Sequence, residues 1–225
     1  MIEIKHRYTR AVIHTVLADT LVGADLRGAN LREADLFVAS MSGVNLLGAD
    51  MHGADLRGAD MRGADLSEAN LRWADMRGVA LCEADLRGAD MCWVDLRCAD
   101  MRGANLYMAN LRQAKLRQAT LIRTILPENV PIVPDIDAQI LAIIEKHPDL
   151  FDMSTWHCGT TYCRGGWAIT LAGEAGKDLV RQVSSPATAA TLIYAASRPN
   201  KPVPDFFTTT AAAIADIRAC AAQKE

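Results

Sequence analysis

Large hydrophobic residues recur at every fifth position between Leu21 and Leu121, always as Leu or Met. Two residues before each of them, from Ala24 onward, the chain has Ala or, at three positions, Val. The residue between the two is mostly Asp or Asn, and Gly often follows two places after the large residue. A helix needs hydrophobic spacings of three and four, and a half-buried strand alternates with a period of two. The period of five therefore predicts a repeat architecture instead.

The spacing fits a coil in which each five-residue unit forms one short side of a square. The small and the large hydrophobic residues would both point inward, and four units, or twenty residues, would complete one turn. Successive turns would lie at the ~4.8 Å spacing of hydrogen-bonded strands, so the repeats would build a rod about 25 Å tall. Glycine suits the corners because it adopts dihedral angles that other residues resist.

The sequence AlaAspLeuArgGly occurs at 24–28, 54–58 and 84–88. This motif resembles the signature of the pentapeptide-repeat family, and the resemblance covers Leu21 to Leu121. It implies a right-handed quadrilateral β-helix. With the sequence that follows, we expect a mainly β protein that carries a small all-α domain behind the β-helix.

Four segments are expected from composition. Residues 1–19 are rich in Ile, Val, Thr and Tyr and predict a β-hairpin that caps the open end of the coil. The β-helix would occupy 20–126, and a proline-punctuated linker would follow at 127–134. Hydrophobic periodicity predicts a helical domain at 135–225. Its expected helices are 135–146, 163–171, 174–183, 186–197 and 209–222.

Two columns of opposite charge are expected on one face of the rod, because positions twenty apart lie above one another. One interpretation is a solvated, striped face, in which exposed ion pairs contribute little. The other is a docking surface for a partner of matching charge. The candidate binding residues are Asp35, Asp55, Asp75, Asp95, Arg57, Arg77 and Arg97.

The same spacing places Trp73 above Trp93 at a corner where Gly is the common residue. The column of residues just before this corner contains Arg32, His52, Arg72, Cys92 and Arg112. Trp and Arg are the residues most enriched in binding hot spots. We therefore add both tryptophans to the candidate binding surface, where they would contact either a partner or the chain's own helical domain.

Composition narrows the classes of function. The net charge is −3, and the repeat segment is almost neutral, so direct binding of nucleic acid is not expected. The sequence has no apolar run long enough for a membrane span, and its first residues are charged. Six cysteines in a chain of this length do not suggest a disulfide framework. These features predict a cytoplasmic protein with free thiols.

Family resemblance implies one specific partner class. Some pentapeptide-repeat proteins resemble B-form DNA in shape and charge and bind DNA gyrase or topoisomerase IV. Their rods are clearly acidic and dimerise end to end, whereas Arg repeatedly follows Leu in this chain. Mimicry of DNA needs a net negative field, so this departure weakens that implication. The sequence leaves a homodimer open.

An unusual cluster of Trp, His, Cys, Gly and Arg lies at 153–167, just before an expected helix. The segment continuing to residue 176 resembles a poorly characterised helical domain of bacteria and phages. Two chemical interpretations are open. A metal site would use His157, Cys158 and Cys163. A nucleophilic thiol would use Cys163, with His157 as base and Arg164 as anion binder.

A structural interpretation of the same cluster is also open, and we favour it. Thr160 and Thr161 would cap the helix, Gly165 and Gly166 would allow close packing, and Trp156 and Trp167 would fill the core. The sequence as a whole thus predicts a cytoplasmic protein of bacterial or phage origin with no cofactor. Its repeats would form a non-catalytic scaffold for protein–protein contact. The alternative is a thiol enzyme or metal-binding module at 135–225, carried on the rod.

Overall fold

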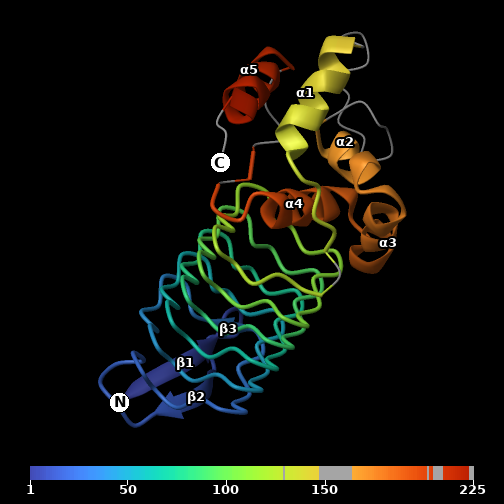
Figure 1. Ribbon diagram of the computed structural model, residues 1–225. Coiled ribbons are helices and arrows are strands. Elements are labelled where there is room, and N and C mark those ends of the chain that lie inside the picture. Colours follow the sequence, from blue (N-terminus) through green and yellow to red (C-terminus); the bar gives the residue numbers. More distant parts are fainter. Residues whose placement is uncertain (129, 147–163, 202, 205–209, 223–225) are drawn as a thin grey trace. The chain divides into compact units, whose positions relative to one another are not determined.

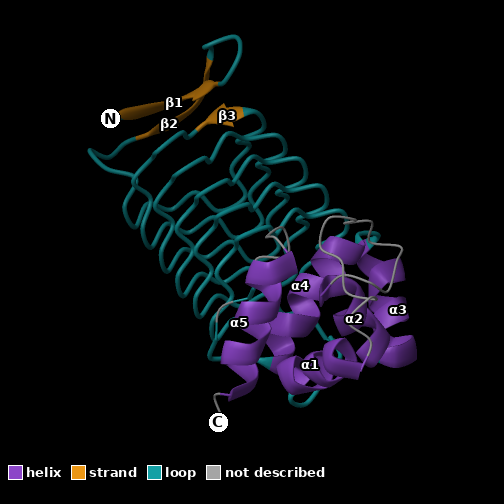
Figure 2. Cartoon of the chain, turned by 90° about the horizontal axis from the view of Figure 1, so that it is seen from above, coloured by secondary structure: helices purple, strands orange, loops and turns teal. Residues whose placement is uncertain are grey.

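The computed structural model describes residues 1–128, 130–146, 164–201, 203–204 and 210–222. They form two compact units, Met1–Glu128 and Asn129–Glu225, which are described separately. The first unit is a coil of stacked turns with strands at its N-terminal end, and the second is helical (Figures 1 and 2). No helix among these residues has the length and apolar character that a membrane crossing requires.

Parallel bridges join residues twenty apart throughout the coil, from Asp25↔Asn45 to Asn105↔Ile125. The predicted turn of four units is therefore present. The backbone N–H of Asn45 donates to the carbonyl of Ala24 at 2.9 Å, and Leu26 donates to the carbonyl of Asn45 at 2.7 Å. The same pair of bonds recurs unit after unit. The coil nevertheless has bridges of single residues rather than long strands, so the expected mainly β character lies in this ladder (Figure 2).

The inside of the coil is filled by the two hydrophobic columns. Leu31, Leu46 and Met61 are fully buried, their equivalents are buried as well, and so are most of the small residues that precede them. Each unit contributes one large and one small side chain, which matches the narrow width of the turn. Close packing of this kind leaves no space for a change of side-chain volume.

The corners of the coil lie in the left-handed region of backbone conformation. Gly53 has φ +67° and Gly63 has φ +64°, as the sequence predicts. Other residues take the same conformation, including Trp73 at +60° and Trp93 at +62°. A residue with a Cβ pays roughly 1–2 kcal/mol for this conformation. The regular ladder on both sides of each corner imposes it.

A hairpin of β1 (Ile2–His6) and β2 (Val12–Val16) lies at the N-terminal end. β1 also pairs with β3 (Ala34–Asp35), so the strand order is β2-β1-β3. Ile4 is buried. Arg7 joins the hairpin to the coil, because its Nη1 donates to the carbonyl of Gly53 at 2.8 Å. These contacts pair part of the backbone of the first turn, at β3, which would otherwise present a free edge.

The second unit contains α1 (Ile136–Lys146), α2 (Arg164–Leu171), α3 (Gly173–Val183), α4 (Pro186–Ser197) and α5 (Thr210–Ala222). α4 packs against α2 and α3, and α1 packs against α5. The N-cap of α4 is Ser185, whose side chain accepts from the N–H of Thr188, and Pro186 takes the favoured first position of that helix. Each of these five helices begins within one residue of its expected start.

The expected linker at 127–134 is attached at both ends. Glu128 accepts a hydrogen bond of 2.6 Å from the hydroxyl of Tyr107 in the coil. Val133 is buried in the helical unit, and its N–H donates to Ser197 Oγ at 2.8 Å. The part of the chain without such contacts is therefore shorter than the linker that the sequence predicts at 127–134.

Candidate protein-binding surface

One face of the coil carries the predicted columns of opposite charge, and we call it the arginine face. It comprises the units centred on Leu36, Leu56, Met76, Leu96 and Leu116. Arg57 Nε donates to Asp55 Oδ1 at 2.8 Å, and Arg57 Nη2 donates to Asp55 Oδ2 at 2.6 Å. The pairs Arg77–Asp75 and Arg97–Asp95 have the same two-pronged geometry. Such bidentate pairs fix both side chains in one orientation.

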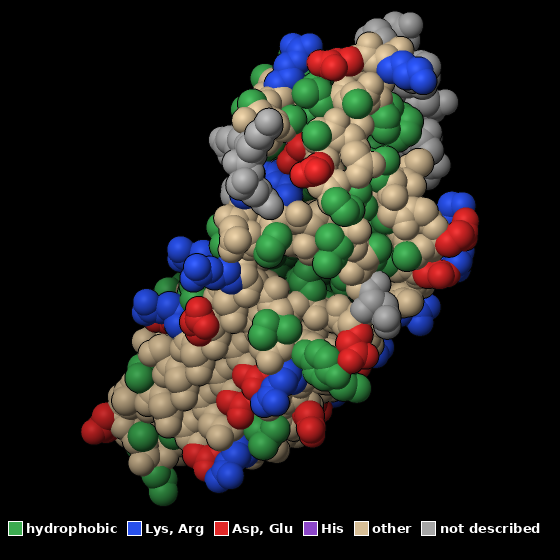
Figure 3. All heavy atoms as spheres, in the orientation of Figure 1, with side chains coloured by type: hydrophobic (Ala, Val, Ile, Leu, Met, Phe, Trp, Pro, Cys, Tyr) green, Lys and Arg blue, Asp and Glu red, His purple; other side chains and the backbone are tan. Residues whose placement is uncertain are grey.

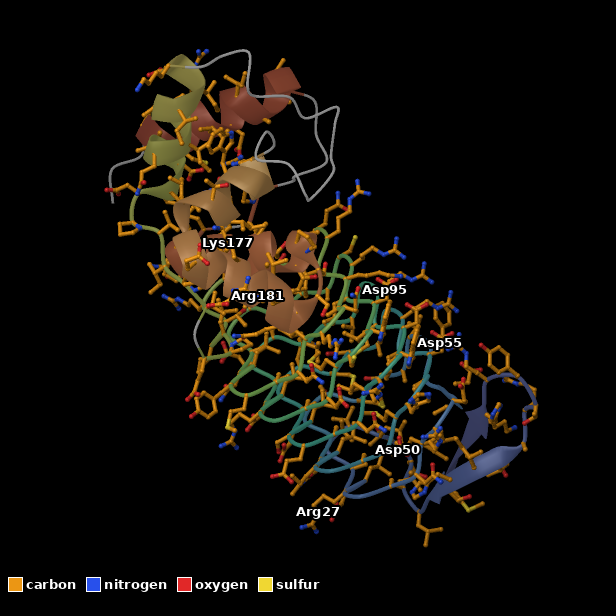
Figure 4. All side chains as sticks on the ribbon, turned by 90° about the vertical axis from the view of Figure 1, so that its right-hand side faces the viewer. Arg27, Asp50, Asp55, Asp95, Lys177 and Arg181 are labelled. Carbon is orange, nitrogen blue, oxygen red and sulfur yellow. The ribbon has the colours of Figure 1, made fainter. Side chains whose placement is uncertain are left out.

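The aspartates of this face are neutralised by the protein itself. Arg10 pairs with Asp35, Arg57 with Asp55, and Lys115 Nζ lies 3.9 Å from Asp95 Oδ2. Figure 4 shows Asp55 and Asp95 along one side of the coil, with Arg27 on another. In Figure 3 basic and acidic side chains lie next to each other over the coil. The aspartate column therefore has no excess negative charge, and it does not support mimicry of DNA by this face.

Asp55 is the most buried of these aspartates, at 5% exposure. Hydrogen bonds from the Arg57 side chain hold the pKa of the Asp55 carboxyl below its ordinary value, against the effect of burial. A carboxyl with a lowered pKa stabilises the folded state above its unfolded pKa of about 3.9, and this stability is lost as the pH falls through the folded value.

We therefore expect thermal stability to fall in acid below about pH 4. Asp55→Asn should lower stability at neutral pH and reduce this acid-induced loss, which melting curves between neutral pH and about pH 3 would measure. Asp25→Asn is the matched control, since Asp25 makes the same pair with Arg27 at an exposed site. Equal effects of the two substitutions would contradict the role assigned to Asp55.

Trp73 and Trp93 form the tryptophan corner, which lies between the arginine face and the preceding face. Their ring centroids are 4.9 Å apart and the planes differ by 1°, so the predicted stack is present. Trp73 is 53% exposed and Trp93 is 41% exposed. A stacked aromatic pair is a stable arrangement, and here it also holds two large apolar side chains toward the outside.

We call the face before this corner the asparagine face. Repulsion between stacked aspartates is reduced there in a different way. Asn and Asp alternate in its column, so Asn70 Nδ2 donates to Asp50 Oδ1 at 2.9 Å. Arg72 Nη1 donates to Asp90 Oδ2 at 3.2 Å. Cys92 is buried beside this column. The corner thus lies between two faces whose polar groups are rigidly paired.

In the helical unit, His157, Cys158 and Cys163 lie outside the described residues. Arg164 is described and is only 1% exposed. Its Nη2 donates to Asp137 Oδ1 at 2.5 Å, its Nη1 to Asp216 Oδ2 at 2.5 Å, and its Nε to the Tyr194 hydroxyl at 2.8 Å. These contacts give Arg164 a structural role in place of the expected anion-binding one. In the described part of the chain, no group of His, Cys, Asp and Glu could hold a metal ion.

This buried cluster was missed in the sequence, although a signal was present. Asp137 lies three and seven residues before Ile140 and Ile144, on the same buried stripe of α1. Arg198 Nη1 also lies 3.0 Å from Asp137 Oδ2. An acidic residue on a hydrophobic stripe indicates a buried cation nearby, because an unpaired buried charge is costly.

A family model described as pentapeptide repeats matches the chain in eight copies, over residues 20–58, 45–81 and 74–113. A pentapeptide repeat protein from the thylakoid lumen of Arabidopsis thaliana is 33% identical over 44% of this chain and 68% of that chain, with a TM-score of 0.38. Another, from Nostoc PCC 7120, is 43% identical over 40% of this chain and 75% of that chain, with a TM-score of 0.25. The chain belongs to the pentapeptide-repeat family.

A further solved structure is QnrB1, a plasmid-mediated fluoroquinolone resistance protein. It is 20% identical over 46% of this chain and 60% of that chain, with a TM-score of 0.31. That similarity supports no statement about the partner of this pentapeptide-repeat protein. No curated protein matches this chain. The family model ends at residue 113, and the resemblance of 153–176 to a bacterial and phage domain stays a prediction.

Proposed function

We propose that the repeat coil of this pentapeptide-repeat protein is a scaffold that binds another protein through the tryptophan corner. The stacked pair of exposed indoles carries this proposal. Trp residues dominate the energy of protein interfaces when they enter a pocket of a partner. Two of them on the same corner offer a large apolar contact.

The coil also favours binding through its rigidity. The tryptophan corner is fixed by backbone bonds to both neighbouring turns: the Trp73 N–H donates to the Cys92 carbonyl at 3.1 Å, and the carbonyl of Arg72 accepts from the Gly53 N–H at 2.9 Å. A side chain that is already ordered loses little conformational entropy when a partner binds. The backbone cost of placing tryptophan at a left-handed corner is therefore offset by a preorganised contact.

Replacement of both tryptophans by Gly tests the proposal without straining the fold, because Gly adopts the left-handed corner readily. We expect Trp73→Gly/Trp93→Gly to weaken partner binding by about 30-fold or more, as for a hot spot of about 2 kcal/mol. A partner captured from lysate and then purified would be titrated by isothermal calorimetry.

Met108→Gly is the matched control, since Met108 is an exposed apolar residue at another left-handed corner. This control should bind like the unmodified protein. Equal affinities of the double variant and the unmodified protein would refute the proposed contact, provided that the melting temperatures also agree.

Family resemblance supports a more specific partner within this proposal, DNA gyrase or topoisomerase IV. The two faces other than the arginine and asparagine faces contain seven acidic and five basic residues between 20 and 126. Any DNA-like field would therefore come from those faces. A supercoiling assay with and without a quinolone tests this partner, using the full chain and a chain that ends at residue 126. Unchanged supercoiling at micromolar protein would exclude this partner.

A further inference from the structure

Arg57, Arg77 and Arg97 form an uninterrupted column on three successive turns, which we call the arginine ladder. Each uses Nε and Nη2 to hold the aspartate two residues earlier. The Nη1 atom of each makes no hydrogen bond with the described residues, and the side chains are 40–43% exposed. Three guanidinium groups are thus fixed in place, and each has a donor left for another molecule.

The ladder does not recur on the other faces of the coil. Arg62 and Arg102 make the same bidentate pair with aspartate, but Cys82 lies between them. Arg27 and Arg87 are separated by two turns, which carry Leu47 and Ser67 at this position. An isolated exposed ion pair contributes little to recognition, whereas a column of them presents donors at the regular spacing of the turns.

The balance of basic and acidic residues also differs between the faces of the coil. The arginine and asparagine faces together contain eight basic and seven acidic residues, and the other two faces contain five and seven. Arg7 and Arg10 of the hairpin also reach the arginine face, where they lie near Asp55 and Asp35. The side of the coil that bears the tryptophan corner is therefore the more basic one.

We propose that the arginine ladder and the tryptophan corner together bind an acidic protein segment. The inference rests on the proposed function and adds the chemistry of the partner. The Arg Nη1 atoms and the indole N–H groups are donors only, and carboxylates accept from both. Arg–carboxylate bonds are charge-assisted, and the apolar parts of the segment would cover the indoles.

Nucleic acid fits this surface less well. A phosphate backbone requires many uncompensated cations, and here each guanidinium is already paired with an aspartate. The carboxylates between the guanidinium groups would repel a continuous polyanion. A protein segment can instead place single carboxylates beside the free Nη1 donors and keep apolar residues elsewhere.

A fluorescently labelled glutamate-rich peptide with interspersed leucines tests the inference by anisotropy titration against the full chain. We expect Arg77→Gln/Arg97→Gln to weaken peptide binding about tenfold or more, since each charge-assisted bond is a strong one. Arg62→Gln/Arg102→Gln is the matched control, because it also leaves two aspartates without their arginines. It should bind within about twofold of the unmodified protein.

A variant that also carries Asp75→Asn and Asp95→Asn keeps the net charge while it removes the ladder. It should lose binding as well, since the proposal depends on placed donors rather than on overall charge. Added salt should weaken the peptide complex, and a lysine-rich peptide with the same leucines should not bind. Melting curves of every variant confirm that the coil is folded.

Three results would overturn the inference. They are equal losses in the ladder variant and its control, no binding of the glutamate-rich peptide, and tighter binding of a DNA duplex than of that peptide. If Trp73→Gly/Trp93→Gly weakens binding of the purified partner and the ladder variant does not, the proposed function stands and the acidic partner is refuted. If neither variant affects the partner, the proposed function itself fails.

Discussion

Replacing Leu71 by Ala should lower the free energy of unfolding of the coil by about 2–5 kcal/mol, one of the two largest effects expected here. Leu71 is fully buried between Met51 and Met91 in its column. Each unit supplies only one large inward side chain, and the backbone ladder holds the turns at a fixed spacing. The coil therefore cannot collapse around the missing atoms, and the cavity remains.

Urea unfolding followed by circular dichroism would measure this loss, with Met51→Leu as the control. That substitution nearly conserves volume in the same column, so it should cost less than about 1.5 kcal/mol. If Leu71→Ala were as mild as Met51→Leu, the coil would have to relax in a way that the fixed ladder does not allow.

The second large effect is expected in the helical unit. Arg164→Ala should destabilise it by about 3 kcal/mol, because it leaves the buried Asp137 carboxylate with one cation fewer. Arg198 remains beside Asp137, so we expect the lower end of the range for a broken buried pair. Burial of Tyr194 raises the pKa of its hydroxyl, which stays neutral and cannot supply a countercharge.

Thermal unfolding followed by the helical circular dichroism signal would test this prediction. Arg181→Ala removes an exposed pair with Asp178 on α3 and should cost less than about 1 kcal/mol. The double variant Asp137→Leu/Arg164→Met should be more stable than Arg164→Ala, because apolar groups of similar size need no countercharge. Unchanged stability of Arg164→Ala would reopen the interpretation of Arg164 as an anion binder.

The strict period made the coil predictable from sequence. With no slip between Leu21 and Leu121, the twenty-residue turn follows, and so does the stack of Trp73 on Trp93. Neither result depends on long-range packing, since each turn contacts only the turns next to it. The expected helices also agree closely with the observed ones, because hydrophobic periodicity is a local signal.

Side-chain pairing was less predictable. The sequence placed an arginine column beside an aspartate column, but it did not reveal that Arg57 binds the aspartate of its own unit through two bonds. That outcome depends on rotamers, which the repeat does not encode. In the helical unit, Asp137 lies in the first turn of α1, and its carboxylate binds Arg164. Such a contact depends on how α1 and α2 pack, which periodicity alone does not determine.

The bridges between residues twenty apart also limit how such a chain can change in length. Insertion or deletion of twenty residues would add or remove one turn and leave every column on its original face. A five-residue insertion would instead rotate everything after it by a quarter turn. Placed between Arg77 and Trp93, it would carry Trp93 and Arg97 to the next face while Arg57, Trp73 and Arg77 stayed in place. Gain or loss of whole turns therefore preserves this surface, whereas gain or loss of a single five-residue unit would divide it between two faces.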